Sequence, residues 1–245
     1  KRIWKESLGR YGVRKVWQQL KREGYVIARC TVARLMQKLG IQGVWRGKNK
    51  QTTRSRDDQK RADDLVKRNF NADHPDQLWV ADFTYIQTHS GWVYTAFIID
   101  VFSRAIVGWK VSTRMNTDMV LDALEQALHD RGMPKNVIHH SDRGVQYLSI
   151  RYTNRLEAAN LRASVGTTGD SYDNALAETV NGLYKTEVIE YLKADWQGLA
   201  DVQLATLNWV DWFNKERVHS ALGYVSPFEF EAMYYDKINP LGQVA

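Results

Sequence analysis

Three acidic residues, Asp82, Asp142 and Glu178, have surroundings that suggest shared chemistry. Asp82 interrupts the apolar strand pattern LWVADFTYI, and thirty-five residues separate Asp142 in HHSDRG from Glu178 in DNALAETVNGLYK. A carboxylate in a buried strand must be compensated for its lost hydration. A divalent cation provides that compensation, because hard carboxylate oxygens are the ligands that Mg²⁺ prefers. We therefore predict a two-metal site for phosphoryl transfer.

The elements that would position these acids follow from local patterns. The sequence places Asp82 in the middle of a first strand, Asp142 at the end of a fourth, and Glu178 about one turn into a helix. Neighbouring strands lie about 4.8 Å apart, so two carboxylates on adjacent strands can share metal ions. The helix must then bring the third carboxylate to them.

An α/β fold is predicted from residue 75 onward. Three strand-like runs come first and form an antiparallel meander, and helices then alternate with two further strands. This order predicts a mixed central sheet flanked by helices. The expected strands cover residues 77–87, 91–101, 104–112, 136–142 and 161–166, and the expected helices cover 117–130, 150–160, 173–192 and 194–217.

The first 45 residues predict a small all-α domain of short helices. Gly24 and Gly40 are expected to end the second and third helices, and Thr31 is expected to be the N-cap of the third. Apolar residues recur at helical spacing and are expected to pack together. They are Val13, Val16, Trp17 and Leu20 in one helix and Val32, Leu35, Met36 and Leu39 in the next.

This unit is interpreted as a helix-turn-helix. Its last helix would expose Arg29, Arg34 and Lys38 to phosphates or base edges in a DNA major groove. The alternative is a helical hairpin whose basic face is only solvated.

Charge is unevenly distributed along the chain. Residues 1–72 hold 20 Lys and Arg against 6 Asp and Glu, whereas residues 73–245 hold 14 against 22. This split favours a polyanion-binding segment joined to a domain whose acids have another task, such as holding metal. We expect residues 1–72 to supply most of the affinity for a polyanion; ordinary solubility charge is the alternative.

Cysteine usage and hydropathy exclude several classes of protein. The single cysteine, Cys30, excludes an intrachain disulfide and a cysteine-based zinc site, and we expect it to be a small buried residue. No apolar run approaches the roughly 18 residues of a membrane span. A soluble intracellular protein is expected.

Competing acids are given structural roles. Asp100 is expected to cap a turn before Ser103, and Asp170 and Asp173 are expected to cap the helix that carries Glu178. Glu187 lies nine residues beyond Glu178, on the opposite helix face at about 100° per residue, so it cannot replace Glu178.

The histidines near these motifs are expected to have no catalytic or metal-binding role. His139 and His140 adjoin Asp142 and are expected to pack, or to touch substrate, and not to bind metal. His219 could be a catalytic base, but two-metal chemistry needs none, so a structural role is favoured.

The motifs together resemble a known family. WVADFTYI, HHSDRGVQY with its spacing to Glu178, and NKERVHSALGYVSP are similar to the DDE transposases of bacterial insertion sequences, specifically the second reading-frame product of the IS-three group. The resemblance covers nearly the whole chain. It implies a retroviral-integrase-like catalytic core with the ribonuclease H fold.

The resemblance also implies a mechanism and partners. Asp82, Asp142 and Glu178 would be the catalytic metal ligands, with two Mg²⁺ ions that Mn²⁺ can replace. The substrates would be the terminal inverted repeats of a mobile element and target DNA, and a homo-oligomer would form on the DNA. The expected location is the bacterial cytoplasm, at the nucleoid. Since the His and Cys pairs of retroviral integrases are missing, no zinc is expected in the N-terminal domain.

Lys185 and Asn181 are the DNA-binding candidates beside the acids. Lys185 follows Glu178 by seven residues, nearly on the same helix face, and the family places a basic residue at this offset. We expect it to bind a phosphate beside the cleaved bond, whereas a solvated surface lysine is the alternative.

The sequence thus predicts four segments: a helix-turn-helix domain at 1–45, a basic linker at 46–74, the catalytic core at 75–190 and a C-terminal helical extension at 191–245. DNA nicking and strand transfer is the leading function. The alternatives are a ribonuclease H-like DNA nuclease without strand transfer and a non-catalytic DNA-binding protein.

Overall fold

The computed structural model describes residues 1–45, 66, 70–142, 144–165, 175–192 and 194–239. Most of the predicted basic linker at 46–74 therefore lies outside the described residues. Within the described part, no helix is long and apolar enough to cross a membrane.

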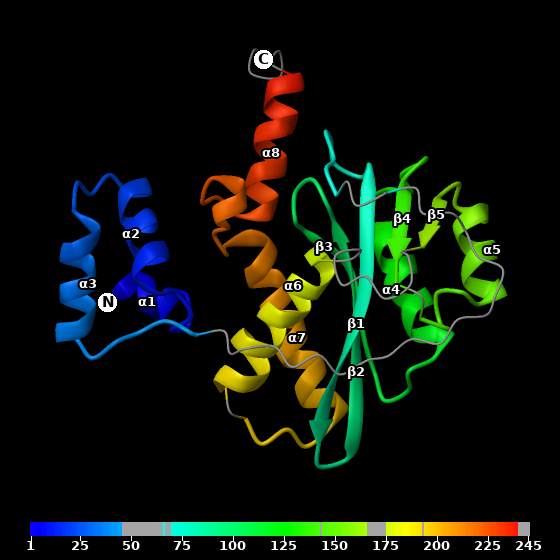
Figure 1. Cartoon of the computed structure of the whole chain (residues 1–245), viewed down its shortest axis with the longest axis horizontal. Helices are drawn as coiled ribbons and strands as arrows, with labels where there is room; N and C mark the ends of the chain where they lie inside the picture. Colours follow the sequence, from blue (N-terminus) through cyan, green and yellow to red (C-terminus); the bar gives the residue numbers. More distant parts are fainter. Residues whose placement is uncertain (46–65, 67–69, 143, 166–174, 193, 240–245) are drawn as a thin grey trace.

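A five-stranded mixed sheet forms the centre of the molecule, with the strand order β3-β2-β1-β4-β5 (Figure 1). The first three strands pair antiparallel, while β1 with β4 and β4 with β5 pair parallel. The predicted meander and mixed sheet are confirmed. The strands are β1 (Leu78–Thr88), β2 (Gly91–Asp100), β3 (Ile106–Ser112), β4 (Ile138–Ser141) and β5 (Arg162–Val165).

Helices cover both faces of the sheet because alternate strand residues point to opposite sides. Trp79 and Ala81 of β1 belong to one apolar cluster, with helices α4 and α5, and Val80 and Ile86 belong to the other, with α6 and α7. These helices are α4 (Thr117–Asp130), α5 (Ile150–Ala158), α6 (Ala175–Tyr184) and α7 (Leu199–Lys215).

The close packing of α4 requires a glycine in β3. A Cβ atom on Gly108 would lie 2.2 Å from the carbonyl oxygen of Ala123 in α4. Only a residue without a side chain allows the helix backbone to approach the strand this closely.

Three short helices, α1 (Arg2–Glu6), α2 (Val13–Arg22) and α3 (Arg29–Lys38), form the N-terminal unit beside the core (Figure 1). Gly24 and Gly40 follow the ends of α2 and α3 with positive φ, as predicted. The prediction of Thr31 as an N-cap is wrong. The cap of α3 is Ala28, and Thr31 lies inside the first turn.

Two packing predictions for α3 are also wrong. Val32 and Met36 are buried, but Leu35 and Leu39 are about half exposed, and Cys30 is exposed. The apolar residues of α3 cover a wider part of the helix surface than α2 can contact. Only one stripe of α3 is therefore buried in the small core.

The N-terminal unit is joined to the core by buried polar contacts. Arg10 donates from Nε to the carbonyl oxygen of Glu187 at 3.1 Å. The hydroxyl of Tyr11 donates to the carbonyl oxygen of Glu216 at 3.2 Å and accepts from the backbone N–H of Val218 at 2.8 Å. These contacts fix the unit against Glu187, which follows α6, and against the segment that follows α7.

Helix α6 continues directly into a π-helix, Lys185–Glu190, labelled η1. Glu187 in this segment is buried and accepts hydrogen bonds from Arg217 and from the indole of Trp209. Burial alone would raise the pKa of Glu187, but the charge and hydrogen bonds of Arg217, together with Lys15 and Trp209, outweigh burial and lower it. An ion pair thus fixes the end of α6 to the chain after α7.

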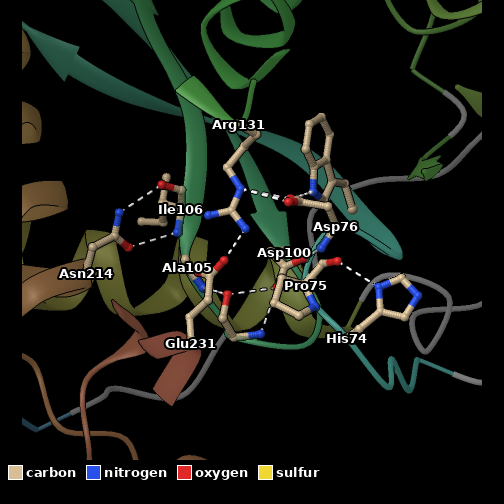
Figure 2. Close-up of polar contacts among 11 residues, drawn as sticks. His74, Pro75, Asp76, Asp100, Ala105, Ile106, Arg131, Asn214 and Glu231 are labelled. Atoms are coloured by element: carbon tan, nitrogen blue, oxygen red, sulfur yellow. Dashed lines mark hydrogen bonds and ion pairs between the residues drawn. The ribbon is translucent and has the colours of Figure 1, made fainter. Parts of the chain in front are cut away.

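A second polar cluster fixes the C-terminal helices to the sheet (Figure 2). Arg131, after α4, donates to Asp76 at 2.8 Å and also pairs with Glu231 of α8 (Pro227–Ile238). The side chain of Asn214 in α7 makes two hydrogen bonds with the backbone of Ile106, at 2.9 and 2.8 Å. A short 3₁₀ turn, η2 (Ser220–Leu222), connects α7 to α8.

Replacing Glu187 with Gln should destabilise the protein by about 3–5 kcal/mol, because it leaves the buried guanidinium of Arg217 without a counter-charge. Urea unfolding at pH 7 measures this loss. The ion pair contributes fully above the ordinary carboxyl pKa of 4.5 and is lost as Glu187 becomes protonated, so the difference should narrow below that pH.

Asp211→Asn is the matched control, since it removes an exposed pair with Lys215 in α7. It should change stability by no more than about 1 kcal/mol. Equal effects of the two substitutions would mean that the buried pair has no special role in the fold.

Candidate active site

Asp82 and Asp142 are brought together where two parallel strands part. Leu78–Ala81 of β1 pair in register with Ile138–Ser141 of β4. Each aspartate is the next residue after the last pair, Ala81 with Ser141. The strand pairing therefore sets the two carboxylates side by side at one point of the sheet, as the sequence predicted.

Both aspartates have raised pKa values. Burial, followed by the negative charge of Asp142, raises the pKa of Asp82 to about 8. Burial likewise raises the pKa of Asp142. Both carboxyls thus hold protons more tightly than free ones, because burial disfavours the charged form and, for Asp82, a like charge lies nearby.

Hydrogen bonds hold both carboxyls in place. The backbone N–H of Phe83 donates to Oδ1 of Asp82 and the side-chain amide of Asn181 donates to Oδ2, both at 2.8 Å. The backbone N–H of Gly144 donates to Oδ1 of Asp142 at 2.9 Å. Asn181 comes from α6, so the helix reaches the strand through this amide.

Glu178 lies three residues before Asn181, in the first turn of α6, and its side chain is exposed. Its charge makes a smaller contribution than Asp142 to the raised pKa of Asp82. In the part of the chain that the structure describes, no three His, Cys, Asp or Glu side chains are arranged to hold a metal ion. The geometry is therefore a close aspartate pair with Glu178 at its border.

The chemistry of this pair suits a hard divalent cation. Two adjacent carboxylates whose pKa values are raised would regain their charged form if a cation compensated them. Asp82, Asp142 and Glu178 supply only oxygen donors, which is the donor type that Mg²⁺ and Mn²⁺ prefer. The residues therefore fit such a cation.

Tyr147 is a component of the site that the sequence analysis missed. Its ring lies beside Phe83, with centroids 6.3 Å apart, and its buried hydroxyl has no hydrogen-bond partner among the described residues. Burial, then Tyr152, Asp142 and Asp82, raise its pKa well above the ordinary value. Its place five residues after Asp142, in DRGVQY, was the available signal.

The predicted structural roles of other acids are confirmed where the structure describes them. Asp100 accepts hydrogen bonds from the backbone N–H and the hydroxyl of Ser103 at 2.7 and 2.8 Å, so it caps the turn. Glu187 points away from the site, toward Arg217. Asp170 and Asp173 lie outside the described residues.

The three histidines are packed into the fold. His139 is buried and lies 3.0 Å from the hydroxyl of Tyr152, and buried His140 lies 2.9 Å from that of Ser164. His219 packs edge-on against Phe213, and burial followed by the charge of Arg217 lowers its pKa. Such a neutral, enclosed imidazole agrees with the structural role that was favoured.

The candidate DNA-binding residues fall into two places. Arg29, Arg34 and Lys38 are exposed on α3, in the N-terminal unit. Lys185 begins the π-helix and holds its ammonium 4.7 Å from the ring centre of Tyr85 in β1. Asn181 is only 8% exposed and its amide is engaged by Asp82, so DNA contact by Asn181 stays a prediction.

Comparison with protein families agrees with this architecture. Two family models, each described as an integrase core domain, match residues 72–171 and 159–227. A model described as an HTH-like domain matches residues 1–49.

Full-length relatives decide the family. The chain is 57% identical over 237 residues to the transposase for insertion sequence element IS629 of Shigella sonnei, covering 97% of this chain and 79% of that protein. It is 34% identical to transposase InsF for insertion sequence IS3A of Escherichia coli, covering 92% of this chain and 78% of that one. The chain belongs to the insertion-sequence transposases. This transposase is thus a polynucleotidyl transferase with an integrase core.

Solved structures share the fold of the transposase at low sequence identity. A chain of the simian T-cell lymphotropic virus intasome superposes with a TM-score of 0.56 at 16% identity, covering 76% of this chain and 61% of that one. The HTLV-2 integrase catalytic core domain in complex with magnesium gives 0.53 at 18% identity, covering 66% of this chain and 99% of that one. The predicted integrase-like fold is confirmed.

Proposed function

We propose that this transposase nicks the terminal inverted repeats of its insertion sequence and joins the resulting 3′ hydroxyl ends to DNA. Asp82, Asp142 and Glu178 are the catalytic residues and the ligands of two Mg²⁺ ions, which Mn²⁺ can replace. The observation that carries this proposal is the pair of crowded carboxylates at the parting of β1 and β4. A solved relative in fold, the HTLV-2 core, is described with magnesium.

Two bound divalent ions would activate the attacking oxygen and stabilise the leaving oxygen of an in-line displacement. Asp82 and Asp142 then act as fixed anionic ligands, since the amides of Asn181, Phe83 and Gly144 hold their oxygens in position. In the first reaction the oxygen of water attacks and a 3′ oxygen leaves. In the second, that 3′ hydroxyl attacks a phosphate of the target strand, and the 3′ oxygen of the target strand leaves as a hydroxyl.

DNA binding in this proposal uses two surfaces. The exposed cations of α3 bind the element end, in the manner of a helix-turn-helix. Lys185 binds a phosphate beside the cleaved bond, and Asn181 lies next to that phosphate. Two or more copies assemble on the DNA, in the cytoplasm at the nucleoid.

The chain divides in this proposal as the sequence predicts. Residues 1–45 are the DNA-binding domain, 46–74 the basic linker, 75–190 the catalytic core and 191–245 its helical extension. The contacts of Arg10 and Tyr11 with the core support an N-terminal domain that is held in a fixed position.

Asp82→Asn, Asp142→Asn and Glu178→Gln should each abolish nicking and joining, because each removes the charge of a ligand and keeps its shape. Labelled terminal repeats incubated with Mg²⁺ and target DNA separate joined from merely cut products. Thermal unfolding and DNA binding should stay close to wild type. Asp100→Asn, a carboxylate away from the site, is the control that should retain activity.

Most activity retained in any one of the three variants would remove that residue from the proposed ligands. Cut DNA without joined DNA from the wild-type enzyme would instead favour a nuclease without strand transfer.

Neutralising Arg29, Arg34 and Lys38 together should flatten the salt dependence of DNA binding. Each lost phosphate contact reduces the slope of log affinity against log salt by about 0.9, so three contacts amount to nearly 3. Fluorescence anisotropy across a series of salt concentrations measures this slope. Lys237→Ala, in α8, is the matched control, and a triple variant with the control's slope would place the DNA elsewhere.

Lys185→Ala should weaken binding to the element end and slow joining, while Mn²⁺ affinity stays unchanged because the ammonium binds phosphate and not metal. Lys185→Arg should recover part of the loss, since it keeps the charge. Single-turnover joining at physiological salt is the measurement. Wild-type joining by the alanine variant would make Lys185 an ordinary surface lysine.

A further inference from the structure

Two large aromatic side chains are exposed on the hairpin that carries Asp82. Tyr85 of β1 is 44% exposed and Trp92 of β2 is 48% exposed. Their ring centres lie 5.3 Å apart with the planes at 81°. The strand register pairs Gln87 with Trp92, so Tyr85 and Trp92 are diagonal neighbours on one face of the hairpin.

A cation completes this surface. The ammonium of Lys185 lies 4.7 Å from the ring centre of Tyr85, on a side chain that comes from the π-helix continuing α6. A cation over an aromatic ring is attracted by the negative face of the ring. The aromatic pair and the lysine therefore form one continuous patch, called here the Tyr85–Trp92–Lys185 patch.

The patch borders the candidate active site. Tyr85 lies three residues beyond Asp82 on the same strand, on the part of β1 that extends past the end of its pairing with β4 at Ala81. Lys185 lies one turn beyond Asn181, which is hydrogen-bonded to Asp82.

Alternation along β1 places the side chains of Asp82 and Tyr85 on opposite faces of the strand, and Lys185 reaches Tyr85 past the strand edge that β4 leaves free. Trp92 lies opposite Gln87, five residues or about 16 Å along the strand from Asp82. A strand of DNA that crosses this edge from the aspartates would thus reach the patch a few nucleotides away.

The hairpin is held firmly enough to present a preformed surface. The backbone N–H of His89 donates to the carbonyl oxygen of Trp196 at 2.9 Å, and that of Ser90 donates to Gln197 at 3.0 Å. The hydroxyl of Ser90 also donates to the carbonyl oxygen of Gln197, at 2.6 Å. These bonds tie the tip of the hairpin to the segment before α7. The hairpin is therefore already ordered, and ligand binding costs it little conformational entropy.

We propose that the Tyr85–Trp92–Lys185 patch is a stacking site for an unpaired base of the DNA strand, a few nucleotides from the bond that the enzyme cuts. The base stacks on the exposed indole of Trp92, Tyr85 supports the indole, and Lys185 neutralises the adjoining phosphate. The inference rests on the proposed function of the same site. It adds an unpaired nucleotide as a ligand class and two aromatic residues as its binding groups.

The composition of the patch favours a nucleotide over a protein surface. A nucleotide has a flat aromatic base and, on the other side of its sugar, a phosphate anion. An exposed indole can stack on the base while a nearby ammonium pairs with the phosphate. Stacking tolerates any base because every base presents a π face, so the site requires no particular flanking sequence.

The test compares two DNA probes that differ only in base pairing. One is a duplex with a three-nucleotide unpaired flap carrying 2-aminopurine, and the other is the fully paired duplex of the same sequence. Binding is measured without divalent metal, so the result does not depend on catalysis. Wild-type protein should quench the flap 2-aminopurine and bind the flap duplex more tightly than the paired one.

Trp92→Ala should weaken flap binding about 5- to 150-fold, the range for loss of one stacked base, and leave binding of the paired duplex nearly unchanged. Trp92→Phe should restore part of the difference, and Tyr85→Leu should reduce it without emptying the hairpin surface. Tyr235→Ala is the matched control, because Tyr235 in α8 has the same exposure as Tyr85. Thermal unfolding confirms that each variant is folded.

Equal flap affinity and quenching in wild type and Trp92→Ala would overturn the inference. So would a Trp92→Ala variant that changes sedimentation from dimer to monomer while flap binding is unaffected, since the patch would then be a contact between copies. Failure of wild-type protein to join DNA would instead count against the proposed function, and the flap measurement would stand independently of it.

Discussion

The structure depends on placing two carboxylates side by side where they are poorly hydrated. Parallel pairing of β1 with β4 brings Asp82 and Asp142 together, and burial with their mutual repulsion raises the pKa of Asp82 to about 8. This arrangement costs stability unless a cation compensates it. The surrounding fold supplies the rest of the support: Asn181 reaches Asp82 from α6, and the buried Glu187–Arg217 pair holds the continuation of that helix.

The same helix connects the site with the rest of the molecule. After α6 the chain enters a π-helix, whose backbone accepts a hydrogen bond from Arg10 of the N-terminal unit. π-Helical segments occur often at functional sites. Here the segment points Lys185 toward Tyr85 and Glu187 toward Arg217. The angle between these two side chains around the helix axis would be different in a regular α-helix, which has fewer residues per turn. The position of the N-terminal unit and the geometry of the site are therefore linked through this π-helix.

Local patterns predicted much of this fold. Period-two apolar runs identified the meander, and α4 begins and ends where its helical pattern does, at Thr117 and Asp130. The errors, at Thr31, Leu35, Leu39 and Cys30, fall in α3 and its C-cap, where a small domain offers little surface to bury. Contacts between distant segments, such as Asn181 with Asp82 and Glu187 with Arg217, leave no periodic signal. The position of Tyr147 beside both aspartates likewise depends on tertiary packing.

Calorimetric titration with Mn²⁺ asks whether the three acids form one metal centre, and it requires neither DNA nor turnover. Mn²⁺ should bind saturably to the wild-type protein, and this binding should be lost or severely weakened in Asp82→Asn, Asp142→Asn and Glu178→Gln alike. Asp100→Asn should bind as the wild type does. Wild-type Mn²⁺ affinity in the Asp82→Asn protein would show that the crowded carboxylates of Asp82 and Asp142 do not form a metal centre.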